Sequence, residues 1–246
     1  MYVFMLLFPE PKKYDLSSMK YWFSGSAPLA FETFSRFKEV FGFEIIEGWG
    51  LTEAGANNAV NPPEGVKKTG SIGLPMKGTE MEVVDSAGNP LPSGKEGEIV
   101  IRGPMLMTGY WNKPQETAEV LRAGWLHTGD IGYKDEDGYF WITDRKKDLI
   151  IKAGENISPR TIEEVLFQHS KVSEAAVIGM KDEVYGEEIK AFLVLKPGQD
   201  ATADEIIEHC RKKLMTFLVP KEVVFLKSLP KSLVGKVLKK ELRKLP

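Results

Sequence analysis

Two charged side chains in the stretch HTGDIGYKDEDGYFWITDRKKDLI, residues 127–150, have the chemistry of a nucleotide clamp. The carboxylate of Asp130 can accept hydrogen bonds from two ribose hydroxyls, and the guanidinium of Arg145 can donate to hydroxyl or phosphate oxygens. If residues 135–138 form the turn, Lys134 faces Tyr139, and Asp130 then lies opposite Thr143. The guanidinium follows two residues later on the same face, about 7 to 8 Å away. The alternative, an exposed ion pair that contributes little, is favoured by the hairpin alone.

Two glycine-containing loops, SGSAPL and GWGLTE, change that balance. Each follows a strand-like run and uses glycine where the backbone must turn sharply or approach a ligand closely. Thr52 and Glu53 set a hydroxyl beside a carboxylate, which suits a phosphate oxygen and its Mg²⁺ because hard cations choose oxygen ligands. Trp49 offers an aromatic face to a purine, although a tryptophan here can equally belong to the core. The convergence of the loops with the hairpin predicts a nucleotide site.

A lysine beside a glycine near the C-terminus is a further candidate. Lys236 follows Gly235 in KSLVGKVLKKELRKLP. A lysine at a flexible tip can stabilise charge that develops between a carboxylate and a phosphate. The alternatives are a solvated helix face or a nonspecific anion-binding patch, because most charged residues in this segment are basic.

The elements that must position these residues begin with a strand, a helix and a strand. The runs YWFSG, PLAFETFSRFKEVFG and FEIIEGWG have the corresponding patterns. Such a unit is almost always a right-handed crossover between parallel strands, so the loops after both strands emerge at the same edge of the sheet. We therefore expect GSAPL and GWGLTEAG to face one crevice.

Two further regimes follow along the chain. Residues 70–143 show short alternating runs, typical of an antiparallel sheet or a small barrel, with one short helix at KPQETAEVL. After Asp148, Ser158 and Pro159 are placed to open a helix, SEAAVIGM and EEIKAFLVL resemble strands, and Thr202 with Glu205 forms a capping-box pattern. The fold class is thus α/β followed by α+β, with predicted domains at residues 1–146 and 147–246.

Composition narrows the class of protein. The 246 residues are 42% hydrophobic and 28% charged, with a formal charge of −2, so no global field favours nucleic acid or an anionic membrane. The single cysteine, Cys210, excludes an internal disulfide framework and fits a reducing compartment, for which we expect the cytoplasm. The apolar start, MYVFMLLF, lacks the basic region and cleavage site of a signal peptide and the length of a membrane span, which favours a buried helix or strand whose packing partner lies elsewhere.

Six stretches in order resemble the AMP-forming adenylating enzymes, in particular fatty-acid and related acyl-CoA synthetases. They are SGSAPL, GWGLTEAG, GEIVIRGPMLMTGYWN, GWLHTGDIGYKDEDGYFWITDRKKDLI, KAGENISPRTIEEVL and LPKSLVGKVLKKELR. The resemblance implies a large adenylate-forming domain, of which residues 1–146 are the C-terminal part with a βαβ unit and a small antiparallel β-barrel, and a mobile α+β domain at residues 147–246. It implies a ligase that joins a carboxylic acid to CoA through an acyl-adenylate, with ATP, Mg²⁺ and CoA.

The resemblance also implies roles for individual residues. Thr52 would hold the α-phosphate, Glu53 the Mg²⁺, and Asp130 with Arg145 the ribose. Lys147 matches the hinge about which the second domain swings, and Lys236 matches the lysine of the adenylation step. The adenine and acyl pocket would be lined by Gly25, Ser26, Ala27, Pro28, Gly48, Trp49 and Gly50, and the loop for the thioester step comprises Lys152, Ala153, Gly154 and Glu155.

The chain departs from the family pattern in two places. The Ser/Thr/Gly-rich loop ending in Pro-Lys-Gly, which grips the β- and γ-phosphates in the family, has no counterpart, and the chain begins about halfway along the family's pattern. We therefore expect a separately encoded N-terminal partner, self-association through the apolar start, or a chain truncated from a longer protein. The second departure is Trp49, where the family more often has tyrosine.

Other functions stay open at this point. Within the superfamily the chain could load an acid onto a carrier protein or act as a luciferase-like oxygenase. Outside it, the chain could bind AMP, CoA or a partner without catalysis. A nucleic-acid role for the basic tail is disfavoured, because no aromatic residues interleave with the basic ones.

Overall fold

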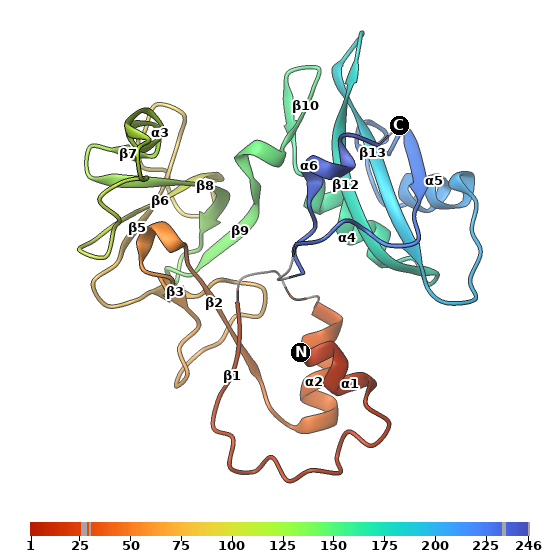
Figure 1. The fold of residues 1–246 in the computed structure, drawn as a ribbon, viewed down its shortest axis with the longest axis horizontal. Coiled ribbons are helices and arrows are strands. Elements are labelled where there is room, and N and C mark those ends of the chain that lie inside the picture. The colour runs from red at the N-terminus through yellow and green to blue at the C-terminus, as the bar shows by residue number, and fades with distance from the viewer. Residues whose placement is uncertain (26–28, 30, 233–234, 246) are drawn as a thin grey trace. The chain divides into compact units, whose positions relative to one another are not determined.

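The computed structural model describes residues 1–25, 29, 31–232 and 235–245, and the chain divides into two compact units, Met1–Ile142 and Thr143–Pro246 (Figure 1). The division by contacts falls inside strand β9 (Phe140–Arg145). The predicted domain boundary between residues 146 and 147 stays a prediction. Each unit is described by itself.

The first unit opens with the predicted strand, helix and strand. Strands β1 (Trp22–Ser24) and β2 (Ile45–Trp49) are parallel neighbours, with Ser24, the last residue of β1, beside Glu47. Helix α2 (Phe31–Phe41) connects them and buries Phe34 and Phe37 against Trp22 and Ile45. The predicted crossover is confirmed, so the chain leaves both strands at one edge of the sheet.

The apolar N-terminal run forms helix α1 (Tyr2–Leu7), which is only partly buried, as expected for a core element whose packing partner lies elsewhere. Only Tyr2 is buried, in ring contact with Trp22 and Phe37. Phe4 is 79% exposed. One face of this short helix packs against α2, and Val3 and Leu7 on its other side are exposed as well.

Two sheets meet in the rest of the first unit. Strands β3 (Ala59–Val60) and β4 (Leu74–Pro75) extend the first sheet to the order β1-β2-β3-β4. The second sheet has the order β5-β6-β8-β7, with β9 also pairing β8. Its other elements are β5 (Glu80–Val84), β6 (Gly97–Arg102), helix α3 (Pro114–Val120), β7 (Leu121–Arg122) and β8 (Trp125–Lys134).

The predicted antiparallel strands are therefore present. In the described pairings, the second sheet has two edges and does not close into a barrel. Phe140 of β9 forms a bridge to Gly73, beside β4, with hydrogen bonds of 2.9 Å. Gly73 has φ +89°, and a Cβ there would lie 2.0 Å from the backbone of Val60. Glycine is thus required where the two sheets meet.

The hairpin between β8 and β9 has a different register from the predicted one. The Asp135 N–H donates to the Tyr139 carbonyl at 2.9 Å, so these two residues close the turn, and Gly138 adopts φ +84°. The predicted register began one residue earlier, from a pair of Lys134 with Tyr139. The extra residue is a left-handed glycine bulge, a common device in three-residue hairpin loops. The count that placed Asp130 opposite Thr143 therefore starts from a pair that does not form.

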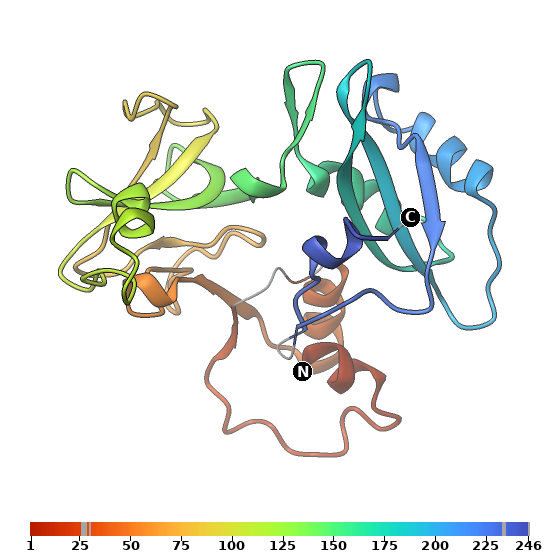
Figure 2. The ribbon, with the colours of Figure 1, turned by 45° about the horizontal axis from the view of Figure 1, so that its top comes forward.

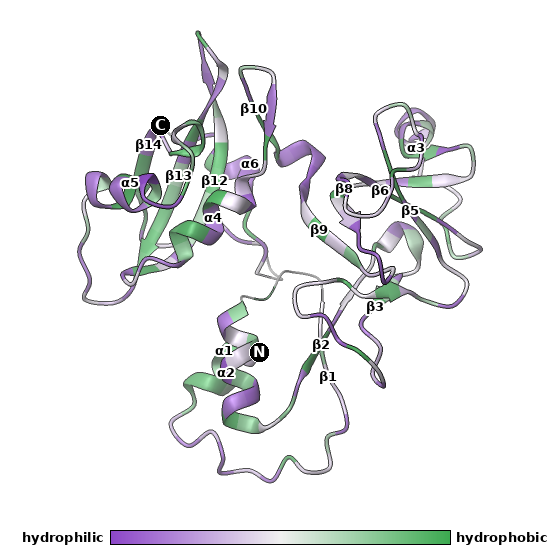
Figure 3. Cartoon of the chain, turned by 180° about the vertical axis from the view of Figure 1, so that it is seen from behind, coloured by the Kyte–Doolittle hydropathy of each residue, from purple (hydrophilic) through white to green (hydrophobic). Residues whose placement is uncertain are grey.

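The second unit is a five-stranded sheet covered on both faces (Figure 2). Its order is β11-β10-β13-β12, with β14 parallel to β13. Val177 and Ile189 pack against helices α4 and α5 on one face, while Ile178 and Phe192 pack against Leu242 of α6 on the other. Figure 3 shows hydrophobic residues along β12 and β13. The elements are β10 (Ile150–Lys152), β11 (Glu155–Ile157), α4 (Pro159–Phe167), β12 (Val172–Asp182), β13 (Gly186–Leu195), α5 (Ala203–Arg211), β14 (Glu222–Phe225) and α6 (Lys239–Leu242).

Both predicted helix starts are found, with different capping chemistry. The Thr202 hydroxyl accepts from the Glu205 N–H at 3.2 Å, as the capping box predicts. Ser158 is the N-cap of α4, but its hydroxyl donates to the buried Asp144 carboxylate at 2.7 Å, and that carboxylate accepts from the Arg160 N–H at 3.2 Å. Across the described part of the chain, no helix is both long and apolar enough to cross a membrane.

Candidate nucleotide-binding site

The glycines of the two predicted loops lie against each other at the carboxyl ends of β1 and β2. A Cβ on Gly25 would lie 3.1 Å from the Gly48 carbonyl oxygen. A Cβ on Gly50 would lie 1.5 Å from the Ala56 carbonyl oxygen, because the chain folds back through a turn after β2. The glycines are therefore needed for the close packing of the loops. Ser26, Ala27 and Pro28 lie outside the described residues.

Trp49 and Asp130 are joined by a hydrogen bond, although 81 residues separate them in the sequence. The Trp49 Nε1–H donates to Asp130 Oδ2 at 3.0 Å. Asp130 is 1% exposed, and Trp49 is half-buried against the core of the second sheet. The structure thus brings the second glycine loop and the clamp carboxylate to one place, and it adds a contact and a degree of burial that the sequence did not indicate.

Thr52 and Glu53 lie in a short 3₁₀ turn, Thr52–Ala54, directly after β2. Thr52 is exposed. The Glu53 carboxylate is half-buried and accepts from the Tyr110 hydroxyl at 2.8 Å, while the Glu53 carbonyl accepts from the Met107 N–H at 2.7 Å. The pKa of Tyr110 is raised above its usual value, mainly because the phenol is partly buried and also because it lies beside this carboxylate. Tyr110 therefore stays a hydrogen-bond donor to Glu53 over the physiological pH range.

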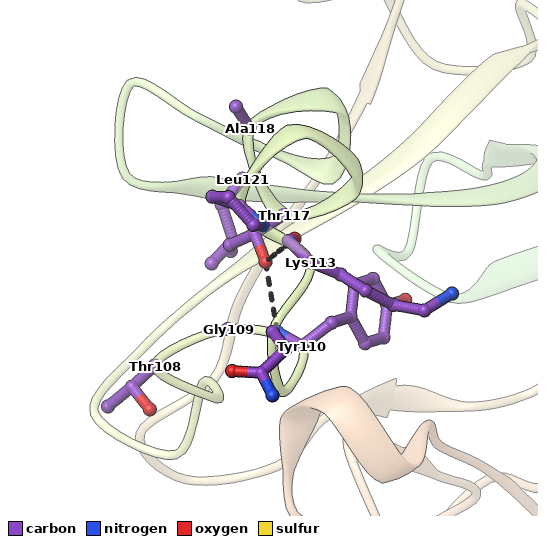
Figure 4. Close-up of a pocket in the computed structure, with 9 residues that line it drawn as sticks. Thr108, Gly109, Tyr110, Lys113, Thr117, Ala118 and Leu121 are labelled. Atoms are coloured by element: carbon purple, nitrogen blue, oxygen red, sulfur yellow. Dashed lines mark hydrogen bonds between the residues drawn. The ribbon is translucent and has the colours of Figure 1, made fainter.

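A shallow hollow of about 410 Å³ lies on the other side of Tyr110, at the start of α3 (Figure 4). The Thr117 hydroxyl accepts from the Tyr110 N–H at 2.9 Å and donates to the Lys113 carbonyl at 2.8 Å. Neither Asp130 nor Trp49 lines this hollow. Residues that line it therefore fix the backbone of Tyr110, whose hydroxyl contacts Glu53.

The remaining hairpin residues belong to the second unit. The Arg145 N–H donates to Asp144 Oδ1 at 2.6 Å, and its side chain is half-buried at the end of β9. Lys147 is exposed in a 3₁₀ turn, Lys146–Asp148, and its carbonyl accepts from Arg243 at 3.5 Å. The predicted clamp partners Asp130 and Arg145 thus lie in different units.

The predicted thioester-step loop is a tight hairpin between β10 and β11. Lys152 pairs with Glu155, and both residues of the turn have positive φ, +51° for Ala153 and +84° for Gly154. Lys152 points inward: its ammonium lies 2.9 Å from Glu188 and donates to the Phe217 carbonyl at 3.1 Å. The exposed tip therefore consists of Ala153, Gly154 and Glu155, and Lys152 anchors it.

Lys236 is exposed beside a second tight turn. Lys231 and Val237 form an isolated bridge, the Gly235 N–H donates to the Ser232 carbonyl at 2.9 Å, and Gly235 has φ +83°. This matches the predicted lysine beside a glycine-formed tip. Sequence reasoning missed Tyr110 and Asp144, although the tyrosine stands in the quoted stretch GPMLMTGYWN and the aspartate directly precedes Arg145.

Comparison with known proteins identifies two matching regions. Residues 1–111 match the family described as AMP-binding enzyme, and residues 161–236 match the AMP-binding enzyme C-terminal domain. The long-chain-fatty-acid–CoA ligase of Bacillus subtilis (strain 168) is 47% identical over 242 residues, which cover 98% of this chain and 43% of that protein. The feruloyl-CoA synthase of an Amycolatopsis species is 40% identical over 99% of this chain and 50% of its own length.

The fold gives the same result. The crystal structure of ATP-bound MatB from Rhodopseudomonas palustris superposes with a TM-score of 0.94 at 34% identity, over 99% of this chain and 48% of that one. The chain thus spans about half the length of the proteins that it matches, or less. With both matched regions in the order expected and with relatives of this identity, the chain belongs to the AMP-binding enzyme family.

Proposed function

We propose that this chain takes part in the ATP-dependent activation of a carboxylic acid to an acyl-adenylate and in the transfer of the acyl group to CoA. The observation that supports this most strongly is the hydrogen bond from Trp49 to Asp130, because it joins two separately predicted nucleotide-binding elements, one at the end of β2 in the first sheet and one in β8 of the second. The Asp130 carboxylate would accept hydrogen bonds from the ribose hydroxyls, and the adenine ring would stack near Trp49. Because Asp130 is 1% exposed, a covering group must move aside for the ribose to reach the carboxylate. A measurement of AMP binding tests whether the site can admit the nucleotide.

In the first step a carboxylate oxygen of the acid attacks the α-phosphorus of ATP. The bond from that phosphorus to the bridging oxygen breaks, and acyl-AMP and pyrophosphate are formed. Thr52, exposed after β2, would donate its hydroxyl to an α-phosphate oxygen. Lys236, on its exposed turn, would stabilise the charge shared between the carboxylate and the phosphate, a role that needs no proton transfer.

Mg²⁺ fits the donor set at Glu53. The described residues hold no group of three or more His, Cys, Asp and Glu side chains that could bind a metal by itself. A single carboxylate beside a hydroxyl is nevertheless what Mg²⁺ uses when substrate phosphates supply further ligands. Tyr110 donates to Glu53 Oε1 and fixes the orientation of the carboxylate. When bound, the ion would neutralise charge on the phosphates.

In the second step the thiol sulfur of CoA attacks the acyl carbon, the thiol proton is lost, and AMP leaves. The exposed tip of Ala153, Gly154 and Glu155 would approach the adenylate in this step, and Lys147 would act as the hinge that brings it there. A flexible joint lets one adenylate site serve two reactions in turn. Anchoring of the loop by Lys152 through Glu188 supports the rigidity that this delivery requires.

A fatty acid is the proposed substrate class. The relative from Bacillus subtilis is named a long-chain-fatty-acid–CoA ligase, whereas the one from Amycolatopsis is a feruloyl-CoA synthase, so aryl acids are the second class to test. We propose the cytoplasm as the compartment. Burial raises the pKa of the lone Cys210 thiol to about 11, which suits a structural cysteine in a reducing environment.

We further propose a partner for the apolar surface of the first unit. Phe4 and Phe31 are 79% and 72% exposed, and Val3 and Leu7 add to the same end of the unit. Apolar surface of this kind normally marks an interface or an aggregation-prone face. A separately encoded N-terminal half, or a second copy of the chain, would cover it. Size-exclusion chromatography that shows a monomer binding no hydrophobic dye would contradict this.

ATP–pyrophosphate exchange by the purified chain tests the function. The assay uses Mg²⁺ and a panel of short, medium, long and aryl acids, alone and with the N-terminal half of the Bacillus subtilis relative added. Lys236→Ala should abolish exchange but spare thioester formation from supplied acyl-AMP, whereas Lys240→Ala, also exposed in the same basic tail, should leave both unchanged. Equal loss of both half-reactions in Lys236→Ala would refute its assigned role. AMP binding without exchange under any condition would favour the noncatalytic alternative.

A further inference from the structure

The ladder between β6 and β8 is interrupted beside Asp130. Glu98 pairs with Ile131, and Val100 pairs with His127. Between these pairs β6 has one residue, Ile99, whereas β8 has three. Thr128, Gly129 and Asp130 lie in the resulting bulge. A bulge leaves backbone groups without ladder partners and redirects the side chains that it carries.

Side chains replace the missing ladder bonds. Glu98 Oε1 accepts from the Gly129 N–H at 3.1 Å. The Thr128 hydroxyl donates to the Ile99 carbonyl at 2.6 Å and accepts from the Asp130 N–H at 3.1 Å. The two backbone N–H groups that precede the Asp130 Cα are therefore held by side chains: that of Gly129 by the Glu98 carboxylate of β6, and that of Asp130 by the Thr128 hydroxyl, which is itself bound to β6.

Glu98 is itself held in place by His127. The Nδ1 atom of His127 lies 3.1 Å from Glu98 Oε2, and the side chains are 15% and 11% exposed. An ionised carboxylate only accepts, so the proton of this hydrogen bond resides on Nδ1. Each oxygen of Glu98 thus has a role: Oε2 fixes the carboxylate, and Oε1 fixes the Gly129 amide.

We propose that Glu98, oriented by His127, is a positioning residue for Asp130. Gly129, whose N–H Glu98 holds, adopts φ +71° and directly precedes Asp130, whose Oδ2 must meet the indole N–H of Trp49. Without Glu98 the bulge can relax, and the carboxylate loses the direction set for ribose hydroxyls. This inference rests on the proposed nucleotide site. The competing reading is that Glu98 and His127 form a partly buried ion pair that stabilises only the sheet.

Two ligands, with and without ribose hydroxyls, distinguish a positioning role of Glu98 from a purely structural one. The affinities of the full chain for AMP and for 2′,3′-dideoxy-AMP are measured by calorimetry for the wild type, Glu98→Ala and Glu98→Gln. Glu98→Ala should weaken AMP binding about tenfold, the worth of a hydrogen bond to a charged group, and leave dideoxy-AMP binding unchanged. Glu98→Gln should rescue AMP binding to within about twofold, because its amide oxygen still accepts from Gly129. Glu80→Ala removes an exposed carboxylate from neighbouring β5 and should change neither affinity.

A readout without nucleotide makes the test independent of the proposed function. The indole N–H signal of Trp49, assigned with Trp49→Phe, should shift and exchange faster with solvent in Glu98→Ala, and stay in place in Glu98→Gln and Glu80→Ala. If Glu98→Ala does not fold, His127→Phe, which keeps Glu98 but removes its donor, should give a smaller change of the same sign.

The outcomes are distinct. An unchanged Trp49 signal, or equal weakening of AMP and dideoxy-AMP, would overturn the positioning role in favour of a structural ion pair. A wild-type chain that binds neither ligand, or both equally, would refute the proposed ribose role of Asp130. In that case the Trp49 signal still decides whether Glu98 orients Asp130.

Discussion

Trp49 combines two properties that the site needs at one side chain. Its ring presents an aromatic surface, and its Nε1–H satisfies a carboxylate that is 1% exposed. A buried carboxylate without donors is costly, so this bond contributes to folding as well as to the direction of the carboxylate.

At the residue scale we predict that Trp49→Phe separates these properties. Phenylalanine keeps an aromatic face but leaves Asp130 without one donor, which should lower the free energy of unfolding by about 1–3 kcal/mol. AMP should bind more weakly, because the carboxylate loses its orientation. Urea unfolding and calorimetry with AMP measure both effects. Trp141→Phe, another half-buried indole whose N–H contacts Asp135, is the control and should leave AMP binding intact.

At the element scale, the hairpin of β10 and β11 carries a strained turn. Ala153 has φ +51° and Gly154 φ +84°, the pattern of a type I′ turn, for which Asn-Gly is the preferred pair. A residue with a Cβ in the left-handed region costs about 1–2 kcal/mol, and asparagine tolerates the region better than alanine. The turn with Ala-Gly is therefore less stable than it would be with Asn-Gly, at the tip that we propose approaches the adenylate.

We predict that Ala153→Asn stabilises the second unit by about 0.5–1 kcal/mol, measured by urea unfolding. Gly154→Ala should change stability in the opposite direction, since its φ is further from what a Cβ tolerates. Equal effects of the two substitutions would contradict the assignment of the turn. Thioester formation measured on the same variants would show whether the strain serves the reaction.

Helices α4 and α5 are joined by two histidines. The ring of His169, just beyond α4, meets the edge of His209 on α5 with centroids 4.9 Å apart, and His169 Nδ1 accepts from the Lys171 N–H at 3.4 Å. Burial is the main cause that lowers the pKa of His169, and the neighbouring His209 and Lys171 lower it further. Glu205, 3.4 Å away, partly opposes this shift. The folded unit therefore prefers the neutral imidazole.

The pH dependence follows from that shift. A His pKa lowered in the folded state means that the unfolded chain binds more protons below its own value of about 6.5. Stability should be full above that pH and fall as the pH drops through the lower folded value. In His169→Gln the loss of stability as the pH falls below about 6.5 should be smaller, as measured by urea midpoints. An unchanged pH slope would show that His169 is not the group responsible.

At the scale of the whole molecule, the described residues form separate cores. The clusters around Phe37 and around Ile99 lie within Met1–Ile142, and those around Ile162 and Phe192 lie within Thr143–Pro246. The second unit covers both faces of its sheet with its own helices. It therefore has what a domain needs to fold alone.

We predict that residues 143–246, expressed alone, unfold in one cooperative urea transition with dispersed amide signals. The first unit, with Phe4 and Phe31 exposed, should instead be the part that associates or aggregates when isolated. A second unit that is molten by itself would show that its stability depends on the rest of the chain. A well-behaved isolated first unit would argue against a partner on its apolar end.

The sequence by itself determined the local elements and the family. Helix α2 between Pro28 and Gly42, the parallel strands beside it and the capped start of α5 follow from periodicity and short-range capping chemistry, which depend on residues a few positions apart. The ordered motifs, confirmed by the matches to AMP-binding enzymes, carried the resemblance. The roles of Thr52, Glu53, Arg145, Lys147 and Lys236 remain predictions.

Only the tertiary structure decided the contacts between residues distant in sequence. The bonds from Trp49 to Asp130, from Tyr110 to Glu53 and from Gly129 to Glu98 join different strands and loops, and no local pattern encodes their pairing. The register of the hairpin was missed because Gly138 adopts a left-handed conformation, so that Asp135 rather than Lys134 faces Tyr139 at the turn. Burial was missed for the same reason: whether Asp130 or Lys152 faces inward depends on which elements pack around it, a property of the assembled fold.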